Sequence, residues 1–147
     1  MYKTILVPTD GSALSNKAIK EAAKLAKLIQ AELLLLHVRE PHRPPAQAGG
    51  RSGKSAPRPG EKELEAREEQ DLLKAGEKIA DAMGVTTVAT YVTGTSPYES
   101  IIATARKSKC GLIVMASHGR RGLVGLLLGS ETQKVLTHAT IPVLVVR

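Results

Sequence analysis

Five apolar runs of strand length recur along the chain, and each predicts a β-strand. They cover residues 2–7, 33–38, 85–92, 112–116 and 143–146. The first, second and fourth runs are apolar on both faces, which is typical of strands inside a sheet. The third run carries threonine on both faces and therefore indicates a partly exposed edge strand.

The segments between these runs show the spacing of amphipathic helices. After the first run, Ser12 is a good N-cap. The apolar stripe that follows consists of Leu14, Ala18, Ala22, Leu25 and Ile29. Residues 61–83 predict a second helix, which Gly84 ends. Its expected buried stripe is Leu72, Gly76, Ile79, Ala80 and Met83.

Two further helices are predicted from capping signals. Ser96, Pro97 and Glu99 give a cap, a proline at the first helical position and a capping box. A second capping box, at residues 130–133, predicts that Ser130 caps a short helix before the last strand.

Strands that alternate with helices predict a parallel sheet with right-handed crossovers. We therefore expect one α/β domain over residues 1–147, a doubly wound, Rossmann-like sheet of five parallel strands in the order 3-2-1-4-5, with helices on both faces. Ligands of such sheets bind outside the carboxyl ends of the strands where the strand order reverses. That switch lies between strands one and four, so the expected cleft is bordered by residues 9–10 and 117–119.

Residues that could bind a ligand lie at both borders of this cleft. A phosphate site needs exposed backbone N–H groups and the positive end of a helix, and Gly119, Gly129 and Ser130 can supply them. On spacing alone, these glycines could also serve only a turn. Asp10 can accept hydrogen bonds from sugar hydroxyls, or it can act as a turn residue.

These residues make the chain similar to the universal stress protein family. The resemblance covers nearly the whole sequence, with its clearest segments at residues 8–12, 37–38 and 141–146. The nucleotide-binding branch of the family carries G-x2-G-x9-G-[ST] after strand four. Gly119, nine residues and then Gly129-Ser130 match that pattern, whereas Ala116 replaces its first glycine.

The resemblance implies that the chain binds an adenine nucleotide, ATP, together with Mg²⁺. Asp10 would lie beside the ribose or adenine, and the backbone of Val38 would meet the adenine edge. The loop after strand four and the helix that follows it would line the ribose and hold the phosphates. The full set of expected binding residues is Pro8, Thr9, Asp10, Val38, Ala116, Ser117, His118, Gly119, Arg120, Gly129, Ser130, Glu131 and Thr132. No catalytic or metal-ligating residue is expected.

Composition narrows the remaining function classes. The single cysteine, Cys110, excludes an intramolecular disulfide, and no Cys and His cluster has zinc spacing. No apolar run approaches the ~18 residues of a membrane span, and no signal-peptide layout opens the chain, so a cytoplasmic protein without a membrane partner is expected. With three Tyr and neither Phe nor Trp, stacking platforms for nucleic acid are not expected.

The net charge of +7 is concentrated in one segment. Residues 39–62 hold six Lys or Arg and two Glu, hence +4, together with five of the eight prolines. We expect a mobile Pro/Gly/Arg-rich loop at about residues 39–60, either a solvated linker or a docking loop for an acidic partner. Residues 48–55 fit a loose P-loop pattern, but the flanking prolines prevent a helix from following directly, so we expect no function there.

Two interpretations remain open on function. The first is an ATP-binding stress-response or signalling module with at most slow ATP hydrolysis. The alternative, which Ala116 favours, is a member without nucleotide that acts through dimerisation and partner contacts. A nucleotide-transfer enzyme is less well supported because no catalytic set is visible.

The last strand predicts a homodimer. It is apolar on both faces although the strand order places it at an edge, and only Pro142 and Arg147 interrupt that edge. Pairing of residues 141–147 with a second copy would cover it, and the family resemblance implies the same interface.

Overall fold

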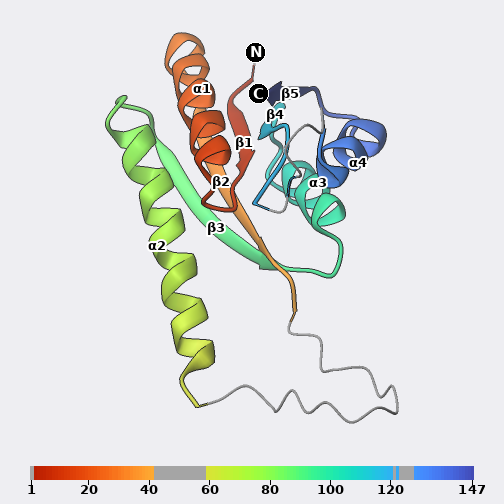
Figure 1. Ribbon diagram of the computed structural model, residues 1–147. Helices are drawn as coiled ribbons and strands as arrows, with labels where there is room; N and C mark the ends of the chain where they lie inside the picture. Colours follow the sequence, from red (N-terminus) through yellow and green to blue (C-terminus); the bar gives the residue numbers. More distant parts are fainter. Residues whose placement is uncertain (1, 42–58, 121, 123–127) are drawn as a thin grey trace.

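A computed structural model describes residues 2–41, 59–120, 122 and 128–147 of the chain (Figure 1). Strand and helix alternate throughout the described chain. The elements are β1 (Thr4–Pro8), α1 (Ala13–Ile29), β2 (Glu32–Arg39), α2 (Glu61–Asp81), β3 (Thr87–Thr93), α3 (Pro97–Lys107), β4 (Leu112–Ala116), α4 (Ser130–His138) and β5 (Val143–Val146). Most of the predicted loop at about 39–60 lies outside the described residues, and the P-loop-like residues 48–55 lie wholly outside them.

The five strands form one parallel sheet in the order β3-β2-β1-β4-β5, which confirms the predicted fold class and strand order. β1 is the central strand, and its Ile5 pairs with Leu33 of β2 on one side and with Leu112 of β4 on the other. β3 is an edge strand, as its threonines predict. The sheet therefore reverses its strand order between β1 and β4, where the cleft is expected.

Helices cover both faces of the sheet, α1 and α2 one face and α3 and α4 the other (Figure 1). The alternation of side chains along β1 divides the core accordingly. Ile5 and Val7 pack in the cluster beneath α1 and α2, whereas Leu6 packs in the cluster beneath α3 and α4. Among the described residues, no helix is both long enough and apolar enough to cross a membrane.

Some predicted boundaries are wrong by one to two residues, and hydrogen bonds explain the differences. The first strand begins at Thr4 rather than at residue 2, because its pairing with β2 starts there. Val85 lies outside β3 because its N–H donates to the carbonyl of Ala80 at the end of α2. Helix α2 ends at Asp81, and residues 82–84 form a turn in which Gly84 has a φ of 73°.

The buried stripe of α2 differs from the predicted one. Its buried residues are Glu69, Leu73, Gly76 and Ala80. Leu72 is only partly buried and packs at the margin of the core. Gly76 and Ala80 are buried as predicted, whereas Glu69 and Leu73 were not predicted; a charged residue such as Glu69 is not expected in a buried stripe.

The capping predictions have mixed outcomes. Ser12 caps α1, since its hydroxyl accepts a hydrogen bond from the N–H of Ser15 at 3.1 Å. Ser96 is the N-cap of α3, but its side chain makes no capping hydrogen bond, so the predicted capping box does not form. The N–H of Tyr98 is bound instead by the carboxylate of Glu131 from α4, at 2.8 Å.

Gly76 allows α2 to approach the sheet closely. A Cβ at this position would lie 2.9 Å from Cδ1 of Leu35 and 3.1 Å from Cδ1 of Ile19, both of which are fully buried. A glycine inside a helix costs about 1 kcal/mol relative to alanine, so close packing is the physical reason to keep it here.

Gly76→Leu is therefore expected to lower the free energy of unfolding by about 2 kcal/mol, because the added side chain overpacks a filled core. Urea unfolding followed by circular dichroism measures this. Ala75→Leu, at the exposed neighbouring position, is the matched control and should change stability by less than about 0.5 kcal/mol. Equal effects of the two substitutions would contradict close packing at Gly76.

Candidate functional site

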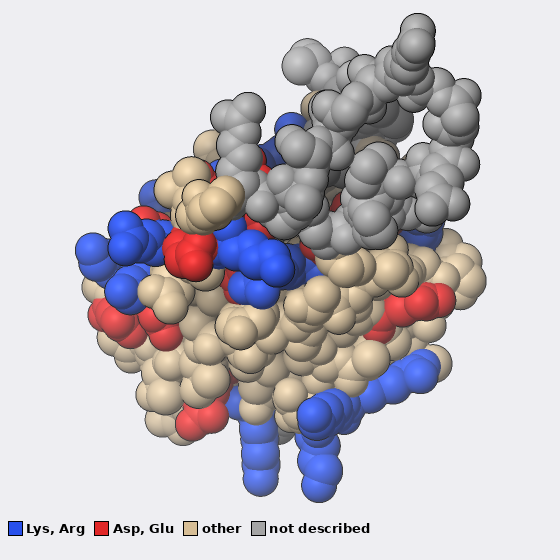
Figure 2. Space-filling view, turned by 90° about the horizontal axis from the view of Figure 1, so that it is seen from below, with Lys and Arg blue, Asp and Glu red and all other residues tan. Residues whose placement is uncertain are grey.

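A cleft of about 1200 Å³ opens at the carboxyl ends of β1, β2 and β4, with walls from α2, α3 and the start of α4. This is the predicted switch point. Figure 2 looks from below onto this edge of the sheet and shows acidic and basic side chains interspersed at its left. Ligand sites are typically 300–1,000 Å³, so the cleft is large enough for a nucleotide.

All the predicted site residues except Ser117 line this cleft. Ser117 is buried, and its backbone N–H donates to the carbonyl of Val146 in β5 at 2.8 Å. Its carbonyl accepts the N–H of Gly129 at 2.6 Å. Ser117 therefore joins β4, β5 and the start of α4 instead of facing a ligand.

Thr9 and Ser15 form the floor of the cleft beside β1. Both side chains are buried, and their hydroxyl oxygens lie 3.1 Å apart. The hydroxyl of Thr9 also accepts the N–H of Gly11 at 3.2 Å, and its carbonyl accepts Nδ1–H of His37 at 3.0 Å. These contacts give Thr9 and His37 structural roles in the cleft wall.

Asp10 connects the two loops that border the cleft. Its Oδ1 accepts the N–H of Ser12 at 3.0 Å, and its Oδ2 accepts the N–H of Arg120 at 2.6 Å. Burial by itself would raise the pKa of Asp10, but hydrogen bonds from Ser12, Arg120 and Ser15 outweigh it, so this pKa lies below its usual value. The carboxylate thus stays charged and holds the glycine-rich loop after β4 against the turn after β1.

The space at this junction leaves no room for a side chain at position 119, which is occupied by Gly119. A Cβ there would lie 2.6 Å from Oδ2 of Asp10. A valine at this position would displace Asp10 and disturb the loop, so its effect on a ligand could not be separated from its effect on the structure. Less disruptive substitutions are needed to test binding.

The start of α4 differs from its prediction. Gly129, not Ser130, is the N-cap, and among the described residues no side-chain hydrogen bond caps this end of the helix. Ser130 is the first helical residue, is exposed, and faces the cleft. The hydroxyl of Thr132 donates to the carbonyl of Ala116 at 3.0 Å and holds the helix against the end of β4.

Glu131 does not use its charge at the start of its own helix. Its Oε2 binds the N–H of Tyr98 at the start of α3, and its Oε1 binds Lys134 at 2.9 Å. This arrangement leaves the positive end of α4 uncapped beside the glycine-rich loop, where an anion would be stabilised.

Ala116 fits the backbone that the resemblance assigns to glycine. Among the described residues, only Gln30 and Lys109 adopt a positive φ without being glycine. Ala116 is therefore free of backbone strain, and only its methyl group distinguishes it from glycine at this site.

His118 lies beside the cleft, and its Nδ1 is 3.2 Å from the hydroxyl of Ser117. The backbone at Gly122 packs closely against the ring of His118, since a Cβ at Gly122 would lie 2.5 Å from Cδ2 of His118. These contacts give His118 a packing role beside the cleft.

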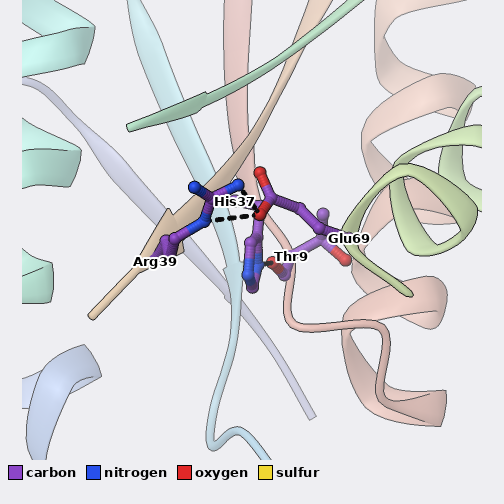
Figure 3. Close-up of polar contacts among 4 residues, drawn as sticks. All are labelled: Thr9, His37, Arg39 and Glu69. Atoms are coloured by element: carbon purple, nitrogen blue, oxygen red, sulfur yellow. Dashed lines mark hydrogen bonds and ion pairs between the residues drawn. The ribbon is translucent and has the colours of Figure 1, made fainter. Parts of the chain in front are cut away.

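The hydrophobic pattern of the sequence did not reveal the cleft wall that α2 and β2 form together. Arg39 of β2 donates from Nε at 2.7 Å and from Nη2 to the same oxygen, Oε2, of Glu69 in α2 (Figure 3). The guanidinium group of Arg39 also lies 4.6 Å from the ring centroid of Tyr91. A glutamate at a buried position of the α2 stripe was the sequence signal that could have indicated this pair.

Comparison with known proteins identifies the family. The whole chain, residues 1–147, matches the universal stress protein family. The chain belongs to this family. It is 37% identical over 150 residues to the universal stress protein YxiE of Bacillus subtilis, covering all of both chains. It is also 36% identical over 149 residues to the universal stress protein MJ0531 of Methanocaldococcus jannaschii, covering 100% of this chain and 83% of the relative.

Solved structures of the family share the fold. One is a universal stress protein in complex with cAMP, with a TM-score of 0.74 and 26% identity over 99% of this chain and 97% of that one. The predicted family resemblance and the predicted fold are both confirmed by these likenesses.

Asp10→Asn is expected to lower the free energy of unfolding at pH 7 by about 1 kcal/mol, the net scale of one hydrogen bond. Because the folded-state pKa of Asp10 is depressed, the stabilisation it gives is complete well above the usual aspartate value of ~3.9 and is lost as the pH falls through the lower folded-state value. Urea unfolding at pH 7 and at pH 3 measures the difference between the two proteins. A difference that did not shrink at pH 3 would contradict a role for the charge.

Proposed function

We propose that the chain binds an adenine nucleotide, with ATP the expected ligand, in the cleft at the carboxyl ends of β1, β2 and β4. The observation that carries this proposal is the uncapped N-terminus of α4, where Gly129 and Ser130 open into the cleft. The N–H groups of such a helix end and its dipole favour phosphate. The family relative whose structure contains cAMP supports the nucleotide class.

The two ends of the cleft suit the two ends of a nucleotide. The glycine-rich loop and the start of α4 offer donors for phosphates. On the other side, Val38, near the end of β2, lines the cleft together with the apolar residues Leu36 and Met115, which suits a purine base. Asp10 lies between them, although both its oxygens already accept backbone hydrogen bonds.

Mg²⁺ would be held mainly by the phosphates. Within the described chain, no group of three or more His, Cys, Asp or Glu side chains could hold a metal ion. Mg²⁺ commonly retains several waters and binds through substrate phosphates, so this protein's residues fit a nucleotide-bound Mg²⁺ and not an independent metal site.

Saturating MgATP, at about 100 times its Kd, should stabilise the protein by about 2.7 kcal/mol, which raises Tm by roughly 5–10 °C for a chain of this length. Ser130→Ala should weaken ATP binding about tenfold through the loss of one charge-assisted hydrogen bond. It should leave stability unchanged, because Ser130 is exposed and caps nothing.

Thr137→Ala, a hydroxyl deletion at the exposed far end of α4, is the matched control and should not alter ATP binding. Calorimetry and thermal shift measure both effects. If MgATP gave no thermal shift up to millimolar concentrations, the alternative function, a member that acts through dimerisation and partner contacts, would replace the proposal.

We also propose that two copies associate through β5. In the described chain this strand pairs only with β4, so its outer edge is open. Leu144 of β5 and Leu136 of α4 are 43% and 42% exposed, unusual for leucine, and α4 contacts β5. A second copy of the strand would cover both the backbone edge and these side chains.

Val145→Lys should shift a dimer toward monomer, because the charge would be buried at the seam or placed against its symmetry mate. Light scattering at tens of micromolar measures the mass. A monomer mass for the unchanged protein would end this proposal, and a dimer unaffected by the substitution would place the interface elsewhere.

A further inference from the structure

The outer edge of β3 lacks the features that normally protect an edge strand. Among the described residues β3 pairs only with β2, and its seven residues include no charged residue, proline or glycine (Figure 1). Natural edge strands are usually protected by charges, proline or bulges, because their open N–H and C=O groups pair readily with another strand. The β3 edge can therefore accept a further strand along its whole length.

Apolar side chains of β3 are also left uncovered on both faces of the sheet. Val88 and Tyr91 are 55% and 52% exposed. Tyr91 lies beside Arg39 on the face that α2 covers, whereas Val88 lies on the other face. On that face α3 packs against β2. A strand added beside β3 would cover part of both side chains.

Hydrogen bonds to β2 determine which backbone groups of β3 point outward. The carbonyl of Thr86 accepts the N–H of Leu33, and the N–H of Gly94 donates to the carbonyl of Arg39. Even-numbered residues therefore direct their backbone groups toward β2, and odd-numbered residues direct theirs to the open edge. The outward-facing residues of the strand are Thr87, Ala89, Tyr91 and Thr93.

We propose that a second copy of this chain docks on this edge, its β3 antiparallel to the first and its Thr90 opposite Thr90 of the first. In an antiparallel pair, outward-facing residues oppose one another and exchange two hydrogen bonds. With Thr90 at the two-fold axis, Ala89 opposes Tyr91 and Thr87 opposes Thr93, so this requirement is met along the strand. Only this register pairs all seven residues.

The side chains of β3 are complementary in the same register. Threonine meets threonine at the centre and at both ends, Val88 meets Val92, and the small Ala89 meets the large Tyr91. Threonine pairs stabilise antiparallel strands, and no like charges oppose each other because the strand carries none. The sequence TVATYVT reads nearly the same in both directions, which suits a two-fold interface between identical strands.

This contact is separate from the proposed pairing of β5 and does not depend on a bound nucleotide. Leucine side chains are exposed at the β5 edge, whereas β3 offers mainly threonine and valine. We therefore expect the β3 contact to be the weaker one, because it buries less apolar surface. Pairing at both edges would join copies of the chain into one continuous sheet.

Cysteine cross-linking tests the proposed register. In Thr90→Cys, the two Cα atoms would lie about 4.5 Å apart in a pair without hydrogen bonds, close enough for a disulfide. Val88→Cys is the matched control on the same face, because the two copies of residue 88 would be offset by four residues, about 13 Å along the strands. The native Cys110 is buried, and the unchanged protein shows its background.

The variants, with folding verified by circular dichroism, are oxidised by air with a copper catalyst, and dimers are measured by non-reducing electrophoresis. We expect Thr90→Cys to form dimers about tenfold faster than Val88→Cys. Random collisions would give the opposite order, since Val88 is more exposed than Thr90. A mixture of Val88→Cys and Val92→Cys should form the mixed disulfide as readily as Thr90→Cys forms its own.

Equal or faster cross-linking of Val88→Cys would overturn the inference. Failure of Thr90→Cys to cross-link would overturn it as well, and would leave the edge to a strand of a different protein. Absence of a link between Val88→Cys and Val92→Cys would contradict the register and would also overturn the inference.

Light scattering of the unchanged protein gives a second test that needs no variant. The mean mass should rise between tens of micromolar and about one millimolar, the range of a weak association. The rise should persist in Val145→Lys, which acts at the other edge of the sheet. A constant mass over this range would overturn the inference, whether the starting species is a monomer or the β5 dimer.

Discussion

The carboxylate of Asp10 joins two loops that are far apart in sequence, and the shape of the cleft depends on this contact. One oxygen orders the turn that begins α1, and the other holds the backbone of Arg120 in the loop after β4. These hydrogen bonds keep the pKa of Asp10 low despite its burial. The same contact explains why residue 119 is glycine, since a side chain there would collide with Oδ2.

At the start of α4, a carboxylate likewise binds a backbone N–H group of another element. A glutamate in the first turn commonly stabilises its own helix end, but Glu131 binds the N–H of Tyr98 in α3 and the amine of Lys134 instead. Thr132 meanwhile holds the helix to Ala116 of β4. The helix is therefore positioned by side chains that leave its first N–H groups uncapped, and this combination supports the proposal of a phosphate site.

In the cleft wall formed by α2 and β2, a buried charge lowers the stability of the fold. Glu69 is buried in the α2 stripe, where an apolar side chain would pack without an electrostatic cost. Within the described residues, Arg39 binds only one of its two oxygens, and the ring of Tyr91 contacts the guanidinium group of Arg39. A buried carboxylate with one unpaired oxygen lowers the stability of the fold.

The sequence alone determined the fold and the position of the cleft. Continuous apolar runs such as 33–36 can be buried only between two helical layers, and threonine-rich β3 fits only an edge. The order of strands then follows, and with it the place where β1 and β4 separate. Residues at strand ends, such as Asp10 and Gly119, could be assigned to the cleft because chain position and strand order suffice to place them.

Only the tertiary structure decided which of these side chains remain available to bind a ligand. Asp10 and Thr9 bind backbone groups of the loops that border the cleft, Ser117 is buried, and Gly129 rather than Ser130 is the N-cap residue of α4. The Arg39–Glu69 pair joins residues 30 positions apart. Periodicity could not reveal it, because a hydrophobic pattern records which face of an element is buried and not which polar partner meets it there.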